Sequence, residues 1–386
     1  MRDRSVLKIG LALSGGGVRA AVFHLGVLAR LATDGLLEQV TFISTVSGGS
    51  MVIGLVYGLS GNHWPDSTTY LSAIVPAARA RLTTTSVQRA ATIKTVRRPW
   101  LLVQGRAKVI ADVLQREWGM VGPLKDVPRE PRWVINATTY ETGKNWRFMP
   151  QRMGDYVVGY VTEPDIPLAD AVAASAAFPG LIGPLVLDTR EFTWNRYTSG
   201  QLVPVDQPRL PKLHLWDGGV YDNLGVEALF KPGRTDGVYR DDYTFLIVSD
   251  ASAPFNGGRT SPWKSPLRLI DIATSQIRSL RSRMLIDHFG RNPDSGVYLR
   301  MGNSASYLLQ DAGVDEVTQR LVADACLPKS DVDAAASVGT HLRQLSAPEF
   351  DRLYRHGWEV TDCTLSSRHS TRFQYQPATT ATLMSF

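Results

Sequence analysis

The chain has 386 residues, of which 44% are hydrophobic, a share that is ordinary for a globular protein and too high for an intrinsically disordered one. Its formal net charge is +6, and no stretch reaches the roughly 18 consecutive apolar residues of a membrane-spanning helix. The two cysteines, Cys326 and Cys363, have neither a metal-ligand nor a redox spacing, so a disulfide framework and a zinc site are not expected.

The N-terminal residues lack the pattern of a secretory signal peptide. Lys8 interrupts the apolar stretch, and glycines follow it without a small-residue cleavage site. We therefore expect a cytoplasmic protein, free or peripherally bound to a membrane, although export by a signal-free route would leave the same sequence.

The first sixty residues alternate between strand and helix patterns. Leu7–Leu13 is a predicted strand, and Val18–Thr33 is a predicted helix with apolar residues at a period near 3.6, ended by Gly35. Val40–Thr45 is a second strand, and Ser50–Tyr57 opens a second helix. Two strands joined by a helix form a parallel pair with a right-handed crossover. The pattern therefore predicts an α/β sheet with helices on its faces.

The later elements are read from the same patterns. Residues 60–130 are predicted to be helical and basic, and from Thr364 onward the composition is polar and rich in Ser and Thr, which predicts a disordered or surface-lying tail. The other predicted strands are Arg132–Thr138, Leu213–Asp217 and Tyr243–Ser249, and the other predicted helices are Thr274–Phe289 and Val314–Ala325.

Three consecutive glycines, Gly15, Gly16 and Gly17, follow the first predicted strand. The run Gly15–Ala20 satisfies G-x-G-x-x-A between a strand and a helix, the context of a dinucleotide-binding fingerprint. That site also needs an acidic residue at the end of the second strand, and residues 44–49 contain none. The other use of such a turn is an oxyanion hole, because glycines let backbone N–H groups point into one concavity beside a helix N-terminus. A turn needed only for tight packing also stays open.

The second turn has the features of a nucleophile elbow, in which a sharp turn between strand and helix exposes a serine hydroxyl. The run Thr45–Gly49 aligns with G-x-S-x-G, except that Thr45 replaces the first glycine. Ser47 is therefore the candidate nucleophile, since Ser44 lies within the predicted strand and Ser50 within the helix. The alternative is that Ser47 only caps the helix.

A serine nucleophile needs a base within hydrogen-bond reach. Among the seven histidines none lies in a motif, and His288, near the end of a predicted helix, is kept as an outside candidate. Asp217 ends a predicted buried strand, and Gly218 and Gly219 after it allow close backbone approach around the carboxylate. If the site excludes water, Asp217 becomes basic enough to take a proton from Ser47 without a histidine. An Asp-Gly-Gly turn without a catalytic role is the alternative.

Taken in this order, the motifs resemble those of the patatin-like phospholipase family, over most of the chain to about residue 250. Gly15–Arg19 resembles the family's glycine-rich oxyanion loop and its following arginine, Thr45–Gly49 its serine elbow, and Asp217–Gly219 the aspartate of its Ser–Asp dyad. Two weaker stretches, Asn136–Gly143 and Ala174–Pro179, resemble a family strand with its turn and a proline corner near the active site.

The resemblance has three departures: Ser14 where the family often has Asp, Ala20 where it often has Gly, and Thr45 in place of Gly. None of them removes a catalytic group. The resemblance implies a three-layer α/β/α fold with a central, mostly parallel sheet, and hydrolysis of acyl esters in lipids without a metal or an organic cofactor. We accordingly expect one hydrolase domain over residues 1–363, with a catalytic core at about 7–250, the basic helical insertion at about 60–130, and the tail at 364–386.

The implied mechanism gives each of these groups a role. Asp217 removes the Ser47 proton, Ser47 attacks the acyl carbonyl, and N–H groups of Gly15, Gly16 and Gly17 hold the oxyanion together with Gly48. Gly218 and Gly219 support the aspartate. Arg19 steadies the glycine loop or lies near a substrate phosphate, and an exposed helix arginine is the alternative.

The stretch 67–111 contains no Asp or Glu and eight Lys or Arg residues. Apolar Trp100–Val103 follows Arg97 and Arg98, a composition typical of an interfacial anchor. It predicts that residues 79–108 contact an anionic membrane surface, with a solvated basic face as the alternative. No motif supports nucleic-acid binding, which is not expected.

Two other functions stay open at this point. One is an α/β-hydrolase esterase with a Ser–Asp–His triad that uses Asp217 and His288, in which case His288→Ala would abolish activity. The other is a nucleotide- or membrane-binding module whose hydrolase site is vestigial.

Overall fold

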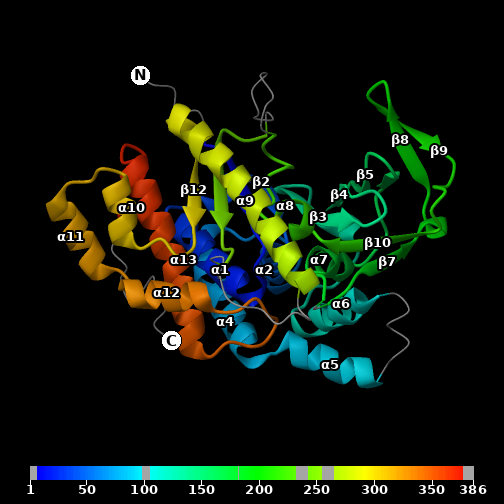
Figure 1. The fold of residues 1–386 in the computed structure, drawn as a ribbon, viewed down its shortest axis with the longest axis horizontal. Helices are drawn as coiled ribbons and strands as arrows, with labels where there is room; N and C mark the ends of the chain where they lie inside the picture. The colour runs from blue at the N-terminus through cyan, green and yellow to red at the C-terminus, as the bar shows by residue number, and fades with distance from the viewer. Residues whose placement is uncertain (1–6, 98–104, 181, 232–241, 254–264, 377–386) are drawn as a thin grey trace.

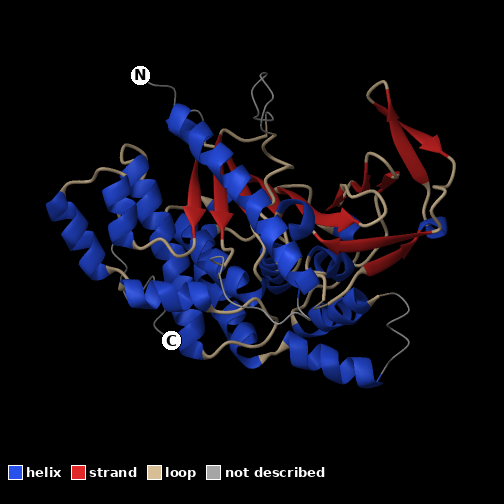
Figure 2. Cartoon of the chain, in the orientation of Figure 1, coloured by secondary structure: helices blue, strands red, loops and turns tan. Residues whose placement is uncertain are grey.

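The computed structural model describes residues 7–97, 105–180, 182–231, 242–253 and 265–376 (Figure 1). The strands, drawn in red in Figure 2, are β1 (Ile9–Leu13), β2 (Val40–Thr45), β3 (Arg132–Thr139), β4 (Asn145–Met149), β5 (Arg152–Asp155), β6 (Gly159–Thr162), β7 (Leu185–Asp188), β8 (Trp194–Thr198), β9 (Gln201–Val205), β10 (Lys212–Asp217), β11 (Phe245–Asp250) and β12 (Gly296–Arg300). The helices are α1 (Gly17–Thr33), α2 (Gly48–Leu59), α3 (Ser67–Thr69), α4 (Val75–Thr84), α5 (Val87–Arg97), α6 (Arg106–Glu117), α7 (Leu168–Ser175), α8 (Gly219–Asp222), α9 (Ser265–Arg291), α10 (Ala305–Asp311), α11 (Glu316–Ala325), α12 (Lys329–Ser337) and α13 (Ala347–Arg368).

The described strands form one sheet whose two halves differ in direction. Strands β12, β11, β1, β2 and β3 lie side by side in that order and run parallel. Strands β4, β5, β6, β8 and β9 continue the sheet beyond β3 as an antiparallel arm, seen at the right of Figure 2. The predicted α/β fold with parallel strands at its centre is confirmed, and the antiparallel arm is an addition that the sequence patterns did not reveal.

The parallel strands are buried on both faces, which gives the molecule its three layers. On β11, Phe245 and Ile247 belong to a hydrophobic core shared with α1, α2 and α13. Leu246 and Val248 of the same strand belong to a second core, which includes Leu285 of α9. Because successive side chains of a strand point to opposite faces, a strand covered by helices on both faces is apolar throughout. This explains why the central run Phe245–Val248 is apolar without a break.

Strand β3 brings two other strands together end to end. One edge of β3 pairs with β4. Along the other edge, the first half of β3 pairs with β2 in parallel, and the second half pairs with β10 in antiparallel orientation. Strands β2 and β10 therefore run toward each other along one edge, and their C-terminal ends, Thr45 and Asp217, meet beside Asn136 of β3. This arrangement places the residues that follow β2 opposite the last residue of β10.

The C-terminal helix α13 packs closely against α1. A Cβ atom added to Gly26 of α1 would lie 2.0 Å from the backbone oxygen of Tyr354, and one added to Gly357 of α13 would lie 2.0 Å from that of Phe23. Only glycine permits an approach this close, so the two helices contact each other backbone to backbone at these positions. The segment after residue 250 is therefore part of the same hydrophobic core as the first helix.

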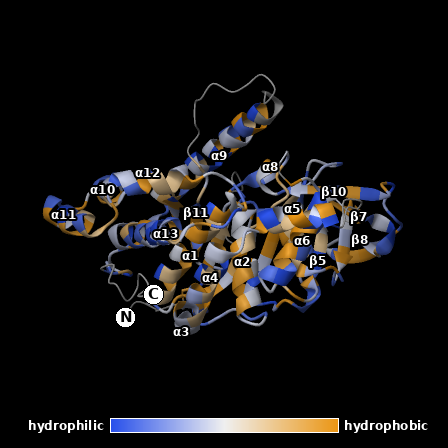
Figure 3. Cartoon of the chain, turned by 90° about the horizontal axis from the view of Figure 1, so that it is seen from below, coloured by the Kyte–Doolittle hydropathy of each residue, from blue (hydrophilic) through white to orange (hydrophobic). Residues whose placement is uncertain are grey.

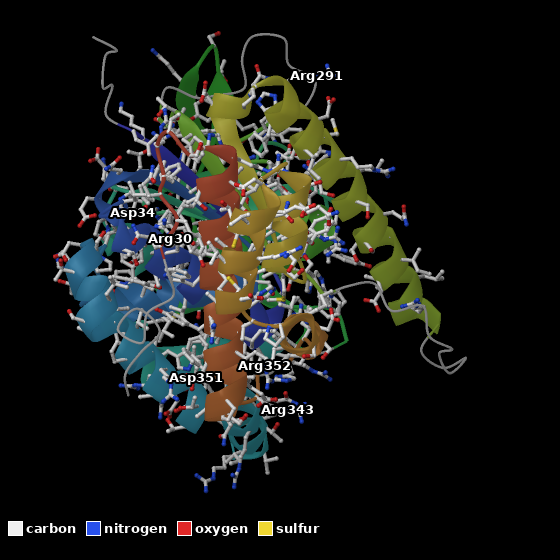
Figure 4. The ribbon with its side chains drawn as sticks, turned by 90° about the vertical axis from the view of Figure 1, so that its left-hand side faces the viewer. Arg30, Asp34, Arg291, Arg343, Asp351 and Arg352 are labelled. Carbon is white, nitrogen blue, oxygen red and sulfur yellow. The ribbon has the colours of Figure 1, made fainter. Side chains whose placement is uncertain are left out.

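Residues 364–376, predicted to belong to a disordered or surface-lying tail, pack against the rest of the protein. Helix α13 continues past residue 364, and Leu365 and Phe373 are buried. Arg30 of α1, labelled beside Asp34 in Figure 4, donates a hydrogen bond to the backbone oxygen of Gln374 at 2.9 Å. Hydroxyl groups of this segment hydrogen-bond to carbonyl oxygens one helical turn back, so a Ser- and Thr-rich composition continues the helix here. Residues 377–386 lie outside the described residues.

The predicted basic insertion, residues 60–130, contains helices α3 to α6. Fewer of its positive charges are unpaired than the sequence indicated. Several of its basic side chains form ion pairs with carboxylates outside the acid-free stretch: Arg79 with Asp351, Lys94 with Asp112, and Lys108 with Asp170. The apolar part of the predicted anchor, Trp100–Val103, lies outside the described residues. Among the helices of the described residues, none combines the length and apolar character needed to cross a membrane.

Candidate active site

The two glycine-containing turns follow the neighbouring strands β1 and β2 and touch each other. A Cβ atom on Gly48 would lie 2.3 Å from the backbone oxygen of Gly17, so a side chain at this position would separate the turns. Gly16 and Gly17 have φ angles of 146° and 64°, which residues with a side chain rarely adopt. Glycine is therefore required at positions 16 and 17 by the backbone conformation and at position 48 by the close contact.

Ser47 occupies a strained backbone conformation between β2 and α2. Its φ of 52° and ψ of −116° are unfavourable for a residue with a Cβ atom. The Ser47 N–H donates to Ser175 Oγ at 3.0 Å, and the Gly49 N–H donates to the carbonyl oxygen of Val46 at 2.9 Å. These bonds hold a turn of the kind that the elbow pattern predicts, with the serine at its strained position.

Thr45, which departs from the glycine of the elbow pattern, takes part in a chain of hydroxyl groups. Its Oγ1 accepts a hydrogen bond from Trp133 Nε1 at 2.9 Å and lies 2.8 Å from Ser50 Oγ. Ser50 Oγ lies 2.8 Å from Ser175 Oγ, which donates to the backbone oxygen of Asn136 at 2.6 Å. The chain ties β2, α2, α7 and β3 together around the turn, so the threonine is accommodated by its hydroxyl.

Asp217 is buried at the end of β10 and lines the same cavity as Ser47. Burial raises the pKa of Asp217 to about 7, and the hydrogen bond from the Gly219 N–H, at 2.7 Å from Oδ1, and the nearby Ser47 side chain partly oppose this shift. Gly218 passes so close to β3 that a Cβ atom would lie 2.5 Å from the Asn136 oxygen. Gly218 thus permits the approach of the turn, and Gly219 binds the carboxylate.

The backbone N–H groups predicted to bind an oxyanion are not equivalent. The Gly15 N–H donates to the carbonyl oxygen of Asn223 at 3.0 Å, so its predicted role as an oxyanion donor is not supported. The N–H groups of Gly16, Gly17 and Gly48 have no acceptor within the part of the chain that the structure describes. They lie at the N-terminal ends of α1 and α2, where the helix dipoles favour a negative charge.

Ser47 and Asp217 line one cavity of about 570 Å³, within the usual range of ligand sites. Its wall combines the two turns, the proline corner and one side of α9. The lining residues are Gly15, Gly16, Arg19, Ser47, Phe178, Pro179, Gly180, Asp217, Gly219, Asn223, Ser252, Ala253, Arg268, Asp271, Thr274, Ser275, Arg278 and Thr340. The three sequence motifs and the predicted proline corner therefore meet at a single concave site.

Arg19 is buried against the glycine turn. Its guanidinium donates to the backbone oxygens of Val338 at 2.5 Å and Ala251 at 3.2 Å. Burial lowers its pKa to about 10, partly offset by the nearby Asp250 carboxylate. These contacts support the predicted role of steadying the loop, and the alternative of an exposed helix arginine is wrong, since only 1% of Arg19 is exposed.

No described histidine lines the cavity. His288 lies with its ring centre 4.8 Å from that of Phe230, in the layer formed by α9. His24 is fully buried, with its ring nitrogens 3.0 Å from Ser249 Oγ and from the Ser14 oxygen, and burial lowers its pKa to about 4. Within the described residues, no group of three or more His, Cys, Asp or Glu side chains is placed to hold a metal ion.

Asn223 belongs to the site and was not among the predicted residues. The Asn223 amide fits between the turn at Gly15 and the turn at Gly219. A Cβ atom added to Gly15 would lie 2.4 Å from Asn223 Oδ1, and one added to Gly219 would lie 2.6 Å from the same atom. Its Nδ2 donates to Ser252 Oγ at 2.8 Å. Its position at the end of the short helix α8, six residues after Asp217, is the sequence feature that could have indicated its role in the site.

Comparison with known proteins establishes the family. A family model described as patatin-like phospholipase matches residues 11–230, more than half of the chain. The chain belongs to the patatin-like phospholipase family. The matched range begins in β1 and extends past Asp217, so both glycine turns and the Asp-Gly-Gly run lie in the part that defines this patatin-like domain.

Related sequences carry the same description in much longer proteins. A patatin-like phospholipase domain-containing protein of Chaetomium globosum is 26% identical over 225 residues, which are 58% of this chain and 23% of that protein. One from Aspergillus oryzae is 25% identical over 230 residues, which are 59% of this chain and 28% of that protein. The shared region therefore makes up about a quarter of these curated relatives.

Solved structures support the fold over nearly the whole chain. Human GIVD cytosolic phospholipase A2 superposes with a TM-score of 0.55 at 16% identity, covering 99% of this chain and 61% of that chain. The same human enzyme in complex with methyl gamma-linolenyl fluorophosphonate has a TM-score of 0.50 at 17% identity, covering 96% and 59%. At these identities the likeness shows the fold, and it confirms the predicted patatin-like architecture.

Proposed function

We propose that this patatin-like protein is a lipid acyl hydrolase of the phospholipase A type, with Ser47 as nucleophile and Asp217 as its base. One observation carries the proposal: the strained Ser47 and the buried Asp217 carboxyl lie together in the wall of one cavity, where the Ser47 side chain lowers the pKa of that carboxyl against the effect of burial. Membership of the patatin-like phospholipase family supports fatty-acyl esters of lipids as the substrate class.

In the first half of the reaction, Asp217 accepts the hydroxyl proton of Ser47 while Ser47 Oγ bonds to the acyl carbonyl carbon. The tetrahedral intermediate collapses by breaking the bond between that carbon and the alcohol oxygen, and Asp217 returns the proton to the leaving alcohol or lysolipid. The acyl group stays on Ser47 as an ester. A pKa of about 7 suits Asp217 to this role, because the same group both accepts and releases a proton near neutral pH.

In the second half, Asp217 takes a proton from a water molecule while the water oxygen adds to the acyl carbon. The bond between the acyl carbon and Ser47 Oγ then breaks, and Ser47 recovers its proton from Asp217. The free fatty acid leaves, and the enzyme returns to its starting state.

The negative oxygen of both tetrahedral intermediates needs hydrogen-bond donors that are already oriented. We assign this role to the N–H groups of Gly16, Gly17 and Gly48, which have no acceptor within the described residues and lie at two helix N-termini. Such a donor typically contributes about 3–4 kcal/mol to transition-state stabilisation. Gly15 serves instead as a packing position against Asn223 and Ser47.

Contact of residues 79–108 with an anionic membrane surface remains a proposal with less support than the sequence gave it. Ion pairs already engage Arg79, Lys94 and Lys108. Helix α5 nevertheless exposes Ile93 and Val96 near Arg97. Unchanged binding to anionic vesicles after neutralisation of Arg97 and Arg98 would contradict this part of the proposal.

The experiment that tests the reaction compares fatty-acid release from mixed phospholipid vesicles by the wild type, Ser47→Ala and a control, Ser60→Ala. Ser60 caps the other end of α2 and lies outside the cavity wall. A fluorophosphonate probe is added in parallel, since the structurally similar human enzyme forms a complex with such a compound. We expect release and labelling in the wild type and in Ser60→Ala, and neither in Ser47→Ala.

Equal release by Ser47→Ala would mean that another group is the nucleophile. Release that His288→Ala also abolishes would favour the triad mechanism over the dyad. A wild type that neither releases fatty acid nor reacts with the probe would contradict the hydrolase proposal and favour a binding module.

A further inference from the structure

Helix α9 forms one wall of the catalytic cavity with a polar side. Asp271, Thr274, Ser275 and Arg278 of this helix line the cavity. Arg278 also donates to the backbone oxygen of Ala253 at 3.3 Å. The side of α9 that faces the protein is thus hydrophilic along the stretch that passes the dyad, and only nearer its C-terminal end does it bury apolar residues such as Leu285.

The opposite side of α9 exposes several large apolar side chains among polar ones. It carries an outer stripe of five residues at helical spacing: Leu269, Ile272, Ile277, Leu280 and Met284. The exposed fractions are 63% for Leu269, 56% for Leu280 and 44% for Met284. Figure 3 shows α9 standing at the edge of the molecule with hydrophobic patches along it. A surface helix of a globular protein normally turns its apolar residues toward the core, and the exposed apolar residues between Leu269 and Met284 depart from this rule.

The positive charge of α9 indicates which kind of surface the outer stripe would bind. The helix contains five arginines and two aspartates, a net charge of +3. Arg283 is exposed beside the stripe, and Arg291, labelled in Figure 4, pairs with Asp287 at 2.9 Å while its side chain stays 76% exposed. Exposed apolar residues on a basic helix are the combination that binds the surface of an anionic lipid bilayer.

The position of α9 beside the cavity agrees with docking on a lipid surface. Its polar side forms the cavity wall, so a surface bound to the outer stripe would lie one helix diameter, about 10 Å, from the cavity. Ion pairs do not separate α9 from the basic insertion. Three cations of the insertion are paired with carboxylates, and so are Arg278, Arg281 and Arg291 of α9. The position of α9 at the cavity wall separates the two surfaces.

We propose that α9 is an interfacial helix, which docks the protein on an anionic lipid surface through its outer stripe and so places the catalytic cavity at that surface. The inference deepens the proposed function, because it takes the substrate to be presented by a lipid surface. Docking does not require hydrolysis, however, so the two are tested separately.

The test uses the 386-residue chain carrying Ser47→Ala, so that vesicles stay intact. Binding to sedimentable vesicles of phosphatidylserine and phosphatidylcholine is compared for this parent, for parent plus Leu280→Gln and Met284→Gln, and for parent plus Val317→Gln and Leu321→Gln. The control pair lies on α11, is 69% and 70% exposed, and has the same spacing of four residues. Glutamine keeps the net charge constant and preserves helix propensity.

We expect the α9 pair to lower the vesicle partition coefficient by roughly tenfold or more, since each buried side chain of this size contributes on that order. The α11 pair should bind like the parent. Binding by the α9 pair equal to that of the parent, an equal loss for the α11 pair, or no binding by the parent would each overturn the proposal.

A second measurement separates docking from folding and from the reaction. With Ser47 restored, the α9 pair should hydrolyse a dissolved short-chain ester at the wild-type rate but release less fatty acid from vesicles. An equal loss on both substrates would overturn the docking role and indicate a structural one. Failure of the catalytic proposal would appear differently, as fatty-acid release that persists in Ser47→Ala.

Discussion

The turn after β1, which contains Gly16 and Gly17, and the turn after β2, which contains Ser47, have similar positions in the fold but present different groups to the cavity. Each follows a parallel strand and leads into a helix, and the two touch through Gly17 and Gly48. In the first turn the unusual φ angles fall on Gly16 and Gly17, which adopt them at little cost. In the second turn the unusual φ falls on Ser47, which has a side chain and is therefore strained.

The difference shows that glycine suits a turn that presents backbone groups but not a turn that presents a side chain. A turn that only has to present backbone N–H groups is best made of glycine, because no side chain is needed there. A turn that has to present a hydroxyl group must keep a side chain in a conformation that glycine would adopt more easily. The hydrogen bonds of Ser175 and the close packing of Gly48 hold this strain in the folded state.

The largest expected effect comes from replacing Ser47 by Gly or by Ala. Either change should lower hydrolysis by a factor on the order of 10⁵–10⁶, because the nucleophile is lost. Only Ser47→Gly also relieves the strained φ, so it should raise the free energy of unfolding by about 1 kcal/mol relative to Ser47→Ala. Fatty-acid release and urea unfolding measure the two effects. Equal stability of the two variants would show that the positive φ of Ser47 does not lower the stability of the folded protein.

The next largest effect is expected for Asp217→Asn, which keeps the shape of the side chain and removes the base. Hydrolysis should fall by roughly 10³–10⁴-fold. In the wild type, activity should rise with pH through about 7, because only the ionised carboxylate accepts a proton. A pH–rate profile checks this, and a profile without a step near pH 7 would contradict the role of Asp217.

The same carboxyl group makes stability depend on pH. Its folded pKa of about 7 lies above the value of about 3.9 in an unfolded chain, so the folded state holds this proton more tightly. Its stabilising effect is complete below pH 4 and is lost as the pH rises through 7. Asp217→Asn cannot ionise and should therefore unfold less readily than the wild type at pH 8, but not at pH 4. Urea unfolding at both pH values measures the difference.

A smaller effect is expected for Gly48→Ala, which tests the contact between the two turns. The added methyl group would meet the Gly17 oxygen and displace the N–H groups assigned to the oxyanion. We expect hydrolysis to fall by about 10²–10³-fold. Gly290→Ala is the control, since its Cβ atom would have no neighbour within 4 Å. Full activity in Gly48→Ala would show that the turns act independently.

The smallest effect is expected for Ser175→Ala, which removes the hydroxyl that binds the Ser47 N–H. Loss of this buried hydroxyl should cost about 1–3 kcal/mol of stability. We expect kcat to fall by about tenfold with little change in KM, because the hydroxyl positions the turn and does not touch substrate. Ser337→Ala, on the exposed side of α12, is the control. A change in KM alone would assign Ser175 to substrate binding instead.

The local parts of the fold and site follow from the sequence because each motif is contiguous. The predicted boundaries of β2 and α1 differ from the observed ones by at most one residue, since apolar periodicity and glycine punctuation mark them directly. The positive φ at Gly16 and Gly17 and the strained φ at Ser47 likewise lie where the turn patterns indicate them.

What the sequence did not reveal depends on residues far apart in the chain. Ser175 reaches Ser47 across 128 positions, and nothing in its own alanine-rich stretch indicates a hydroxyl network. The Gly15 N–H is taken by Asn223, a pairing that no local pattern encodes. Composition was misleading at residue 364, because serine and threonine side chains bonded within the helix look, in sequence, like those of a tail.

The head-to-head meeting of β2 and β10 has a consequence for how the protein is made. The proposed nucleophile lies at position 47 and its base at 217, so 170 residues separate them on the nascent chain. At typical synthesis rates the ribosome needs roughly 10–30 s to cover that distance. During this interval the serine has been synthesised and its base has not. Assembly of the proposed catalytic pair is therefore a late event in the biosynthesis of this chain, reached only after Asp217 has emerged and β10 has paired with β3.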